Sequence, residues 1–295
     1  MYSAATNDME IEIRLLETPA ELRQVEDLQR VVWPGNETEI VPVHMLRAAV
    51  EHGGLVIGAF DGERLIGFVF GFPGLRKTPH GLSPMHASHM AGIHPDYRDR
   101  GLGFRLKRAQ WQMVRAQGLD LIQWTYDPLL SRNARLNIAK LGAVCSTYIR
   151  EYYGELRDGL NAGIPTDRLL VDWWVNTPRV RQRLSTASRR SLDLAHFLAS
   201  GAQIINPSRL RPDGWPEPMD IAAEKFDDNI LLLEIPSDFP ALRRADPQLG
   251  LSWRLHSRHL LEELFRQGFL ITDFVFLSGT SPRSFYVLSH GESTF

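Results

Sequence analysis

Two arginines and two glycines lie within the six residues RDRGLG, 98–103, just before a helical pattern of apolar residues. The first amides of a helix have no intrahelical partners, and the helix dipole adds about half a positive charge, so this end of a helix attracts phosphate. Gly101 and Gly103 leave the backbone there free of Cβ atoms, while Arg98 and Arg100 add charged hydrogen-bond donors. The stretch therefore predicts a site for a phosphate-bearing ligand.

The spacing of these residues excludes two common phosphate loops. A P-loop needs a lysine followed by serine or threonine after its last glycine, and this stretch has none. A Rossmann turn needs a third glycine, and Leu106 stands at that position. The remaining pattern, Arg98-x-x-Gly101-x-Gly103 between a strand and a helix, resembles the pyrophosphate loop Q/R-x-x-G-x-G/A of the GNAT (GCN5-related N-acetyltransferase) superfamily. An ordinary tight turn with solvated arginines is the alternative.

Two longer stretches strengthen the resemblance. IHPDYRDRGLGFRL, residues 93–106, is similar to the family's strand and basic turn, and SRNARLNIAKLGA, residues 131–143, is similar to its later helix. The resemblance covers about residues 10–176. The segment YDPLLSRNARLNIAKLGAV, residues 126–144, joined to a C-terminal extension, resembles the predicted-acyltransferase branch of the family, some members of which look like N-succinyltransferases of amino acids. The resemblance implies an N-acyltransferase that moves the acyl group of acetyl-CoA, or of succinyl-CoA, directly to the amine of a small molecule such as an amino acid.

The resemblance also implies which residues contact the acyl-CoA. The basic turn would hold the pyrophosphate, the backbone of the preceding strand would pair with the pantetheine arm, and an asparagine near the start of the later helix would lie beside that arm. Gly92 suits a close approach or a bulge in the strand. The implied cofactor-binding residues are Ala91, Gly92, Ile93, Arg98, Asp99, Arg100, Gly101, Leu102, Gly103 and Asn133.

A general base is expected on the strand before the turn, where the family often has a carboxylate. This chain has Ala87 near that position. His89 projects to the same face of the strand as Ala87, and a histidine pKa near 6.5 suits deprotonation of an amine. Glu37 and Glu39 are rival candidates, because they lie in the loop between the first two predicted helices, which borders the acceptor pocket in the family.

A general acid is the second catalytic group to be placed. Many relatives have a tyrosine four residues before the glycine that ends the later helix, and here that position is Ile138. Tyr148, Tyr152 and Tyr153 on the next predicted strand are substitutes, or the thiolate leaves without a proton. The missing groups also favour an alternative function, a non-catalytic acyl-CoA-binding sensor or scaffold. The candidate catalytic residues are His89, Tyr148 and Glu37.

Metal chemistry is not expected. The single cysteine, Cys145, excludes an intramolecular disulfide and argues against a thiolate zinc site. His86 and His89 should face opposite sides of a strand, and His256 and His259 lack an acidic or cysteine partner nearby in the sequence.

Composition narrows the partners and the compartment. A net charge of -2 over 295 residues gives no overall field for nucleic acid, and the basic residues 179–190 are expected to be a solvated helix face. No segment approaches the roughly 20 apolar residues of a spanning helix. We expect a cytoplasmic protein whose partner is a small-molecule amine, with no nucleic acid and no membrane, and a homodimer is left open.

These candidate residues need a mixed α/β scaffold. We expect a GNAT-type central mixed sheet flanked by helices in residues 1–176, with elements in the order β-α-α-β-β-β-α-β-α-β-β. Residues 177–295 are expected to form a smaller α/β unit, as a cap or a dimer element. Local signals include a capping box at Thr18 and Glu21, an irregular exposed loop at 73–84 and a long basic helix at 177–201.

The second unit resembles part of the first. GLSWRL, residues 250–255, aligns with GLGFRL, residues 101–106, and apolar strands flank both copies. We interpret this as a degenerate half-repeat of the strand–turn–helix–strand unit, with chance similarity of two amphipathic helices as the alternative. Because Pro247 and Ser252 replace the arginine and the second glycine of the turn, the second copy is not expected to hold an anion.

Overall fold

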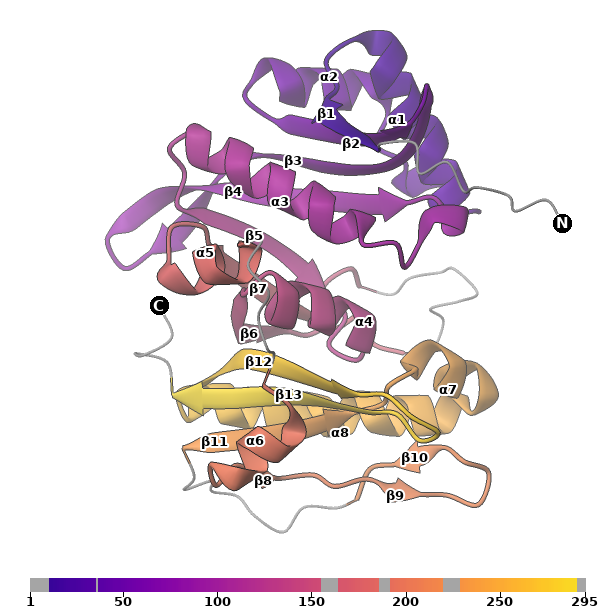
Figure 1. The fold of residues 1–295 in the computed structure, drawn as a ribbon, viewed down its shortest axis with the longest axis vertical. Helices are drawn as coiled ribbons and strands as arrows, with labels where there is room; N and C mark the ends of the chain where they lie inside the picture. The colour runs from indigo at the N-terminus through magenta and orange to yellow at the C-terminus, as the bar shows by residue number, and fades with distance from the viewer. Residues whose placement is uncertain (1–10, 36, 155–163, 186–191, 220–228, 291–295) are drawn as a thin grey trace, which may run out of the picture. The chain divides into compact units, whose positions relative to one another are not determined.

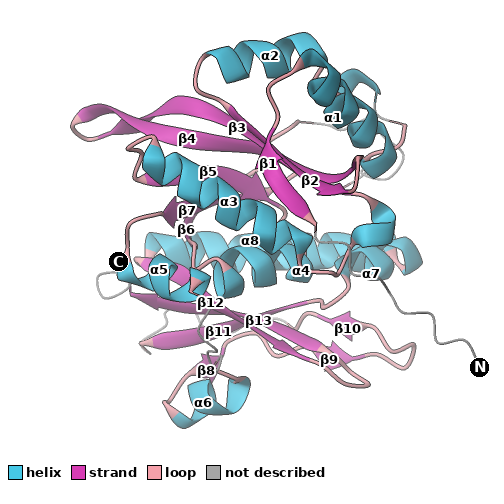
Figure 2. Cartoon of the chain, turned by 45° about the horizontal axis from the view of Figure 1, so that its top comes forward, coloured by secondary structure: helices cyan, strands magenta, loops and turns pink. Residues whose placement is uncertain are grey.

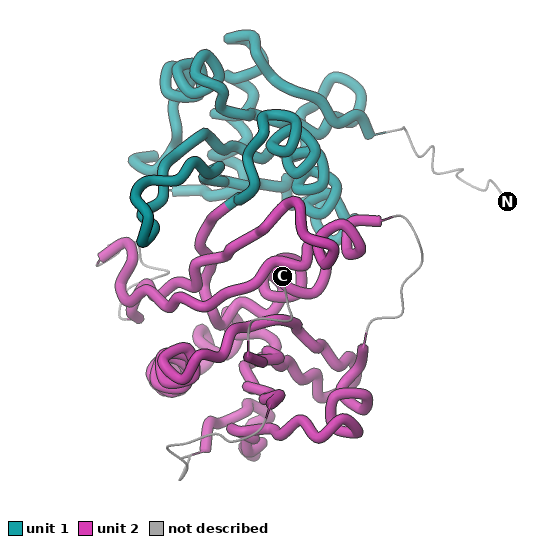
Figure 3. Tube along the Cα trace, turned by 90° about the vertical axis from the view of Figure 1, so that its left-hand side faces the viewer, with its two compact units in different colours: residues 1–122 teal, residues 123–295 magenta. Residues whose placement is uncertain are grey.

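The structure is a computed structural model that describes residues 11–35, 37–154, 164–185, 192–219 and 229–290. The chain forms two compact units, residues 1–122 and 123–295 (Figure 3). Each unit combines a sheet with helices, so the predicted mixed α/β class is confirmed (Figure 2). The predicted domain boundary at residue 176 stays a prediction.

Unit 1 carries the predicted phosphate turn. Its strands pair in the order β1-β2-β3-β4, each antiparallel to the next (Figure 1). The elements are β1 (Glu12–Leu15), α1 (Pro19–Val32), η1 (Glu37–Glu39), α2 (Val43–Glu51), β2 (Leu55–Asp61), β3 (Arg64–Thr78), β4 (Gly81–Ile93), η2 (Pro95–Tyr97) and α3 (Leu102–Ala116).

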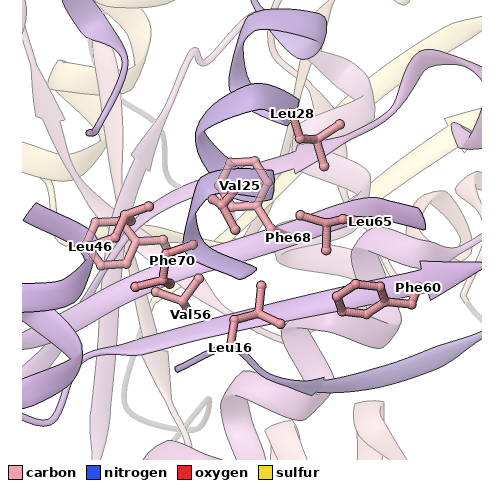
Figure 4. Close-up of a cluster of buried hydrophobic side chains, with 10 residues drawn as sticks. Leu16, Val25, Leu28, Leu46, Val56, Phe60, Leu65, Phe68 and Phe70 are labelled. Carbon is pink, nitrogen blue, oxygen red and sulfur yellow. The ribbon is translucent and has the colours of Figure 1, made fainter. Parts of the chain in front are cut away.

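Helices α1 and α2 are held against one face of this sheet by apolar side chains. Thr18 caps α1 in the predicted capping box with Glu21. Val25 of α1 and Leu46 of α2 lie in one buried cluster with Phe68 and other side chains of β2 and β3 (Figure 4). Helix α3 covers the opposite face, since a Cβ at Gly67, the neighbour of Phe68, would lie 3.3 Å from Leu106 of α3.

The predicted irregular loop at residues 73–84 is wrong, because β3 and β4 continue through it as a regular hairpin with Thr78 opposite Gly81. Strand β2 stops pairing with β3 at Gly71. Beyond that point β3 has a free edge on the side of β2, and a proline is tolerated at a free edge, where no ladder hydrogen bond is lost. The predicted exposure of this segment is correct, with Leu75 61% exposed.

Unit 2 contains the remaining predicted elements and completes the expected order. Its strands pair in the order β5-β7-β6-β12-β13-β11-β8, with β9 and β10 as a separate small hairpin. The elements are β5 (Leu121–Tyr126), α4 (Ser131–Ala134), the π-helix η3 (Arg135–Lys140), β6 (Val144–Ile149), β7 (Arg168–Trp174), α5 (Pro178–Leu184), α6 (Leu194–Ala199), β8 (Gln203–Ile204), β9 (Arg209–Leu210), β10 (Pro216–Glu217), β11 (Ile230–Ile235), α7 (Phe239–Ala245), α8 (Pro247–Arg266), β12 (Phe269–Leu277) and β13 (Arg283–His290).

The predicted basic helix at 177–201 is wrong in extent, and two of its arginines face inward. The segment begins with the short helix α5, and its later arginines, Arg189 and Arg190, lie outside the described residues. Arg179 donates to the carbonyl of Gly142 at 2.9 Å. Arg183, 10% exposed, donates to the carbonyl of Ala139 and forms an ion pair with Asp273 at 2.6 Å. These arginines therefore hold the end of η3 instead of forming a solvated face.

Arg183 gives a stability prediction. We expect Arg183→Met to lower the free energy of unfolding by about 3 kcal/mol, because it leaves the half-buried Asp273 carboxylate and a helix-end carbonyl without their partner. Arg181→Met, at an exposed position of the same helix, should change it by less than about 0.5 kcal/mol. Urea unfolding followed by circular dichroism measures both variants, and equal values for the two would contradict the assignment.

Candidate functional site

The predicted phosphate turn begins helix α3 with two residues in the left-handed region. Asp99 has φ 64° and Gly101 has φ 77°. A Cβ built on Gly101 meets nothing within 4 Å, so glycine is favoured there by its backbone conformation and not by lack of space. Gly101 is the N-cap residue, and no side chain caps the helix.

The uncapped helix end leaves several backbone donors for a ligand. The first intrahelical hydrogen bond runs from the amide of Arg105 to the carbonyl of Gly101, at 3.2 Å. The amides of residues 102–104 therefore come before the helical ladder. Arg98 and Arg100 are exposed on either side of Asp99. The turn thus combines free helix amides with two cations, which is the arrangement that phosphate groups bind.

Arg100 is positioned by its neighbour Tyr97. Its guanidinium lies 4.9 Å from the centre of the Tyr97 ring. The Tyr97 hydroxyl donates to Asp61 at 2.5 Å, and this hydrogen bond raises the pKa of Tyr97. The turn is therefore tied to the end of β2 by a tyrosine that stays protonated at neutral pH.

Strand β4 carries the residues expected to contact the pantetheine arm. Ala91 is exposed, Gly92 is buried and Ile93 is half-buried. A Cβ at Gly92 would lie 2.8 Å from the Phe68 ring, so the predicted close approach at this glycine involves that ring. The bulge lies elsewhere in the strand, between the pairs formed by Ser88 and Met90.

The bulge in β4 leaves the His89 ring beside Phe70 of the neighbouring strand β3. The His89 ring is exposed and lies 5.8 Å from the Phe70 ring and 6.1 Å from the Phe72 ring. Partial burial among these rings lowers the pKa of His89 below 6.5. His89 is therefore neutral at physiological pH, the form in which an imidazole accepts a proton.

The rival bases are less available. The Glu37 carboxylate is exposed and accepts from Arg30 Nε at 3.2 Å. Glu39, in the same short helix η1, is also exposed. The environment of His89, in contrast, favours the neutral form that accepts a proton.

A buried polar cluster lies between β4 and α3, and its lysine was not singled out from the sequence. The Lys107 ammonium donates to Ser88 Oγ at 2.7 Å and to Gln110 Oε1 at 3.2 Å. Gln110 in turn contacts His86 Nε2 at 3.1 Å. All four side chains are at most 5% exposed. The cluster therefore ties the helix of the phosphate turn to the bulge in β4.

Burial controls the charge of this cluster. Desolvation lowers the pKa of Lys107 to about 7. Desolvation, together with the nearby Lys107, lowers the pKa of His86 to about 3, so this histidine is neutral. The sequence contains a weak indication that these two polar residues are buried. Lys107 and Gln110 lie seven and four residues before the buried Val114, so helical spacing places them on the same face of α3.

Unit 2 places Tyr148 in a second polar cluster. Its hydroxyl donates to Asp167 at 2.7 Å, and Arg258 of α8 donates to both oxygens of the same carboxylate at 2.7 and 2.8 Å. Asp167 is fully buried. Burial raises the pKa of Tyr148 well above 10, and the hydrogen bond to Asp167 adds to this effect. The phenol is therefore a very weak acid with a fixed hydrogen-bond partner.

The remaining candidate residues of unit 2 lie on or near α4 and η3. Asn133 is half-buried in α4, and Ile138 is fully buried in η3. Asp127, which follows β5, accepts from Arg254 of α8 at 2.5 Å. Arg254 and Arg258 lie one helical turn apart, so a single helix from the C-terminal region holds two carboxylates of this part of the chain.

The described residues contain no group of three or more histidine, cysteine or acidic side chains that could hold a metal ion. Cys145 is free and fully buried, and burial raises its pKa. His86 and His256 each contact an amide side chain, Gln110 and Asn206. Among the described helices, none is long and apolar enough to cross a membrane.

No family model matches the sequence, and no curated protein matches it. Solved structures do resemble part of the chain. NAA60 of Arabidopsis thaliana, in complex with a bisubstrate analogue, is 19% identical, with a TM-score of 0.45 over 56% of this chain and 99% of that one. An acetyltransferase of the GNAT family from Streptococcus pneumoniae is 18% identical, with a TM-score of 0.44 over 55% of this chain and 98% of that one.

A third structure contains the expected ligand. YncA of Salmonella typhimurium, solved with acetyl-CoA, is 14% identical, with a TM-score of 0.45 over 62% of this chain and 99% of that one. The similarity to GNAT acetyltransferases expected from the sequence is thus seen among solved structures.

Lys107 gives a pH prediction. In the unfolded chain a lysine titrates near 10.5, and in the fold Lys107 titrates near 7, so between these values the unfolded state binds more protons. The free energy of unfolding should then rise with pH in this window, by up to about 1.4 kcal/mol per pH unit. Below pH 7 the lysine is charged in both states, and the destabilisation of the fold by its buried charge is complete. We expect Lys107→Met to remove this rise and to be more stable than the parent chain at pH 7.

The measurement is urea unfolding at pH 6 to 10 for the parent chain and the variant. Lys140→Met, at an exposed lysine, is the matched control and should follow the parent chain at every pH. A stability difference between the parent chain and Lys107→Met that does not change with pH would contradict the role of Lys107.

Proposed function

We propose that this chain is an acyl-CoA-dependent N-acyltransferase that acts on the amine of a small molecule. The observation that carries the proposal is the turn at residues 98–103. It begins a helix with no side-chain cap at Gly101, contains two left-handed residues, Asp99 and Gly101, and carries the exposed Arg98 and Arg100 just before the helix in the sequence. A diphosphate would satisfy both the amides and the guanidinium groups.

The N-terminus of α8 supports this interpretation by contrast. Asp246 is its N-cap residue, and the Asp246 carboxylate accepts from the amide of Leu249 at 3.0 Å. A helix end that is closed by its own carboxylate has neither free donors nor a favourable charge for an anion. Of these two helices aligned in the sequence, only α3 keeps its N-terminus open for a ligand.

The proposed reaction is direct transfer. A neutral amine forms a bond to the thioester carbonyl carbon, the carbon–sulfur bond breaks, the CoA thiolate leaves, and the nitrogen of the new amide gives up one proton to the thiolate or to solvent. The base must first take a proton from the ammonium form of the acceptor. His89 is the proposed base, because it is exposed, neutral and placed on β4 four residues before Ile93. The backbone of residues 91–93 is the proposed contact for the pantetheine arm, and Asn133 a further contact.

The finer points of the proposal follow from the resemblance to the predicted-acyltransferase branch. The acceptor is proposed to be an amino acid or a similar small amine, and the donor acetyl-CoA or succinyl-CoA. Tyr148 is the proposed acid. Because its hydroxyl proton is held by Asp167, departure of the thiolate without protonation is the simpler alternative. Glu37 is the second candidate base, and its pairing with Arg30 makes it the weaker one.

A non-catalytic acyl-CoA sensor is the second candidate function. Two observations favour it. The buried Ile138 stands where many relatives have a tyrosine, and the hydroxyl of Tyr148 is already engaged in a hydrogen bond to Asp167. Release of free thiol from acetyl-CoA and succinyl-CoA, in a screen of amino acids and polyamines, separates the two functions. Turnover above the acceptor-free rate with any acceptor supports the enzyme, and binding of CoA without turnover supports the sensor.

The turn gives a binding prediction. We expect Gly103→Glu to weaken CoA binding at least tenfold, about 1.4 kcal/mol, because it adds bulk and negative charge to the proposed pyrophosphate site. Ala116→Glu makes the same change of charge at the exposed far end of the same helix and should leave the affinity within twofold. Isothermal titration calorimetry with CoA measures both, and an unchanged affinity in Gly103→Glu would refute the site.

His89 gives a prediction for the pH profile. A histidine base must be neutral, so kcat/KM should rise as pH increases through the pKa of His89, which burial places below 6.5. In His89→Gln we expect this acidic limb to disappear and kcat/KM at pH 8 to fall by a factor of about 100. Glu37→Gln is the comparison, and an acidic limb that persists in His89→Gln but not in Glu37→Gln would assign the base to Glu37.

A further inference from the structure

Unit 2 contains the same strand order twice. In the first half, β7 lies between β5 and β6, and in the second half, β13 lies between β11 and β12. Helical segments connect the two outer strands in each half, α4 and η3 in the first and α7 and α8 in the second. Each half is therefore a strand, a helical connection, a second strand, and a third strand inserted between the first two.

Equivalent ion pairs mark the same places in the two halves. Arg168 begins β7 and lies 3.8 Å from Asp127, which follows β5. Arg283 begins β13 and forms two hydrogen bonds of 2.8 Å to Glu234, near the end of β11. In both halves an arginine at the start of the inserted strand thus pairs with a carboxylate at the end of the first strand.

The two halves meet through equivalent elements. Strand β6 pairs with β12 in the antiparallel direction, with Cys145 opposite Ile271. Helix η3 of the first half contacts β12 of the second, and α8 of the second half contacts β6 of the first. Figure 1 shows the second half continuing the sheet beyond β6. Such an exchange of equivalent contacts is the mark of a twofold interface.

Side chains across the junction follow the same exchange. Arg254 of α8 reaches Asp127 after β5, at 2.5 Å. In the other direction, Ser131 of α4 contacts Ser284 of β13 at 2.8 Å, and Ser284 contacts Ser237 after β11 at 2.9 Å. The connecting helix of each half is thereby joined to the residues that follow the first strand of the other half.

We infer that the described residues 121–154 and 164–174 on one side, and 230–290 on the other, are two copies of one unit related by an internal twofold, and that the second copy takes the place of a partner subunit at the edge of β6. The chain then has a built-in partner and is a monomer in solution. This pairing equates α8 with α4 and η3. It differs from the alignment of α8 with α3 suggested by the sequence, and gives the C-terminal region a definite role in assembly.

The second copy is closed to the cofactor, because it has no counterpart of the phosphate turn at α3, which precedes residue 121. Asp246 caps α8 and also pairs with Arg211 at 2.9 Å, so the helix end equivalent to α4 carries its own anion. If the proposed function holds, the chain binds a single acyl-CoA, although it contains two copies of half of an acyl-CoA-binding fold.

A disulfide at the junction tests the twofold, because Cys145 is the only cysteine of the chain. Ile271→Cys places a second thiol directly opposite Cys145, within reach of a disulfide. Leu288→Cys is the matched control. It lies opposite Ile271 on β13, two strand spacings or about 9.5 Å from Cys145, beyond that reach.

After mild oxidation we expect Ile271→Cys to form an intramolecular disulfide, seen as a loss of both free thiols with no dimer on a non-reducing gel. The control should keep both thiols. A disulfide-linked dimer would mean that a second copy uses the edge of β6, and free thiols in both variants would mean that β6 and β12 are not paired. Either result overturns the inference.

Two measurements on the unmodified chain complete the test. Light scattering should give the mass of one chain, 33.5 kDa, and a twofold larger mass would overturn the built-in partner. Calorimetry with CoA should give one site per chain, and two sites would overturn the closed second copy. An absence of CoA binding would count against the proposed function alone, because the disulfide and the mass decide the twofold without any ligand.

Discussion

Helix α3 begins without a side-chain cap, and the rest of unit 1 has to hold it in place. A helix end with free amides gains no local stability from a capping hydrogen bond. Here the fixing contacts come later in the helix, where Lys107 and Gln110 join Ser88 and His86 of β4 in the interior. The ligand site is thus left open at one end of α3, and the position of the helix is set by a buried polar cluster one to two turns away.

The cluster uses a lysine in an unusual way. Desolvation opposes the charged form of a buried lysine, and the partners of the ammonium at Ser88 and Gln110 are neutral oxygens. The charge of Lys107 therefore depends on pH near neutrality. A methionine of similar length would fill the same space at lower cost. The lysine instead joins α3 to the bulge in β4 by directed hydrogen bonds, which an apolar side chain cannot do.

Much of the fold could be predicted from local signals, because they depend on a few adjacent residues. The capping box at Thr18 and the glycine at 101 act within one turn of the chain, and both were identified. Ser88, which accepts from Lys107, lies 19 positions away, and Arg258, which donates to Asp167, lies 91 positions away, so no window of sequence reveals these contacts. The same holds for residues 73–84, whose prolines suggest a loop, whereas Pro73 lies on an edge of β3 that the end of β2 leaves unpaired.

The junction between β6 and β12 has a consequence for how this chain can change. In a true twofold dimer, every substitution at the axis appears on both sides at once, so each new side chain must be compatible with a copy of itself. In a single chain the two sides are separate positions, and Cys145 faces Ile271 where a dimer would place two identical residues in contact. Natural variation can therefore make the two sides complementary in size and charge, which a symmetric seam does not allow.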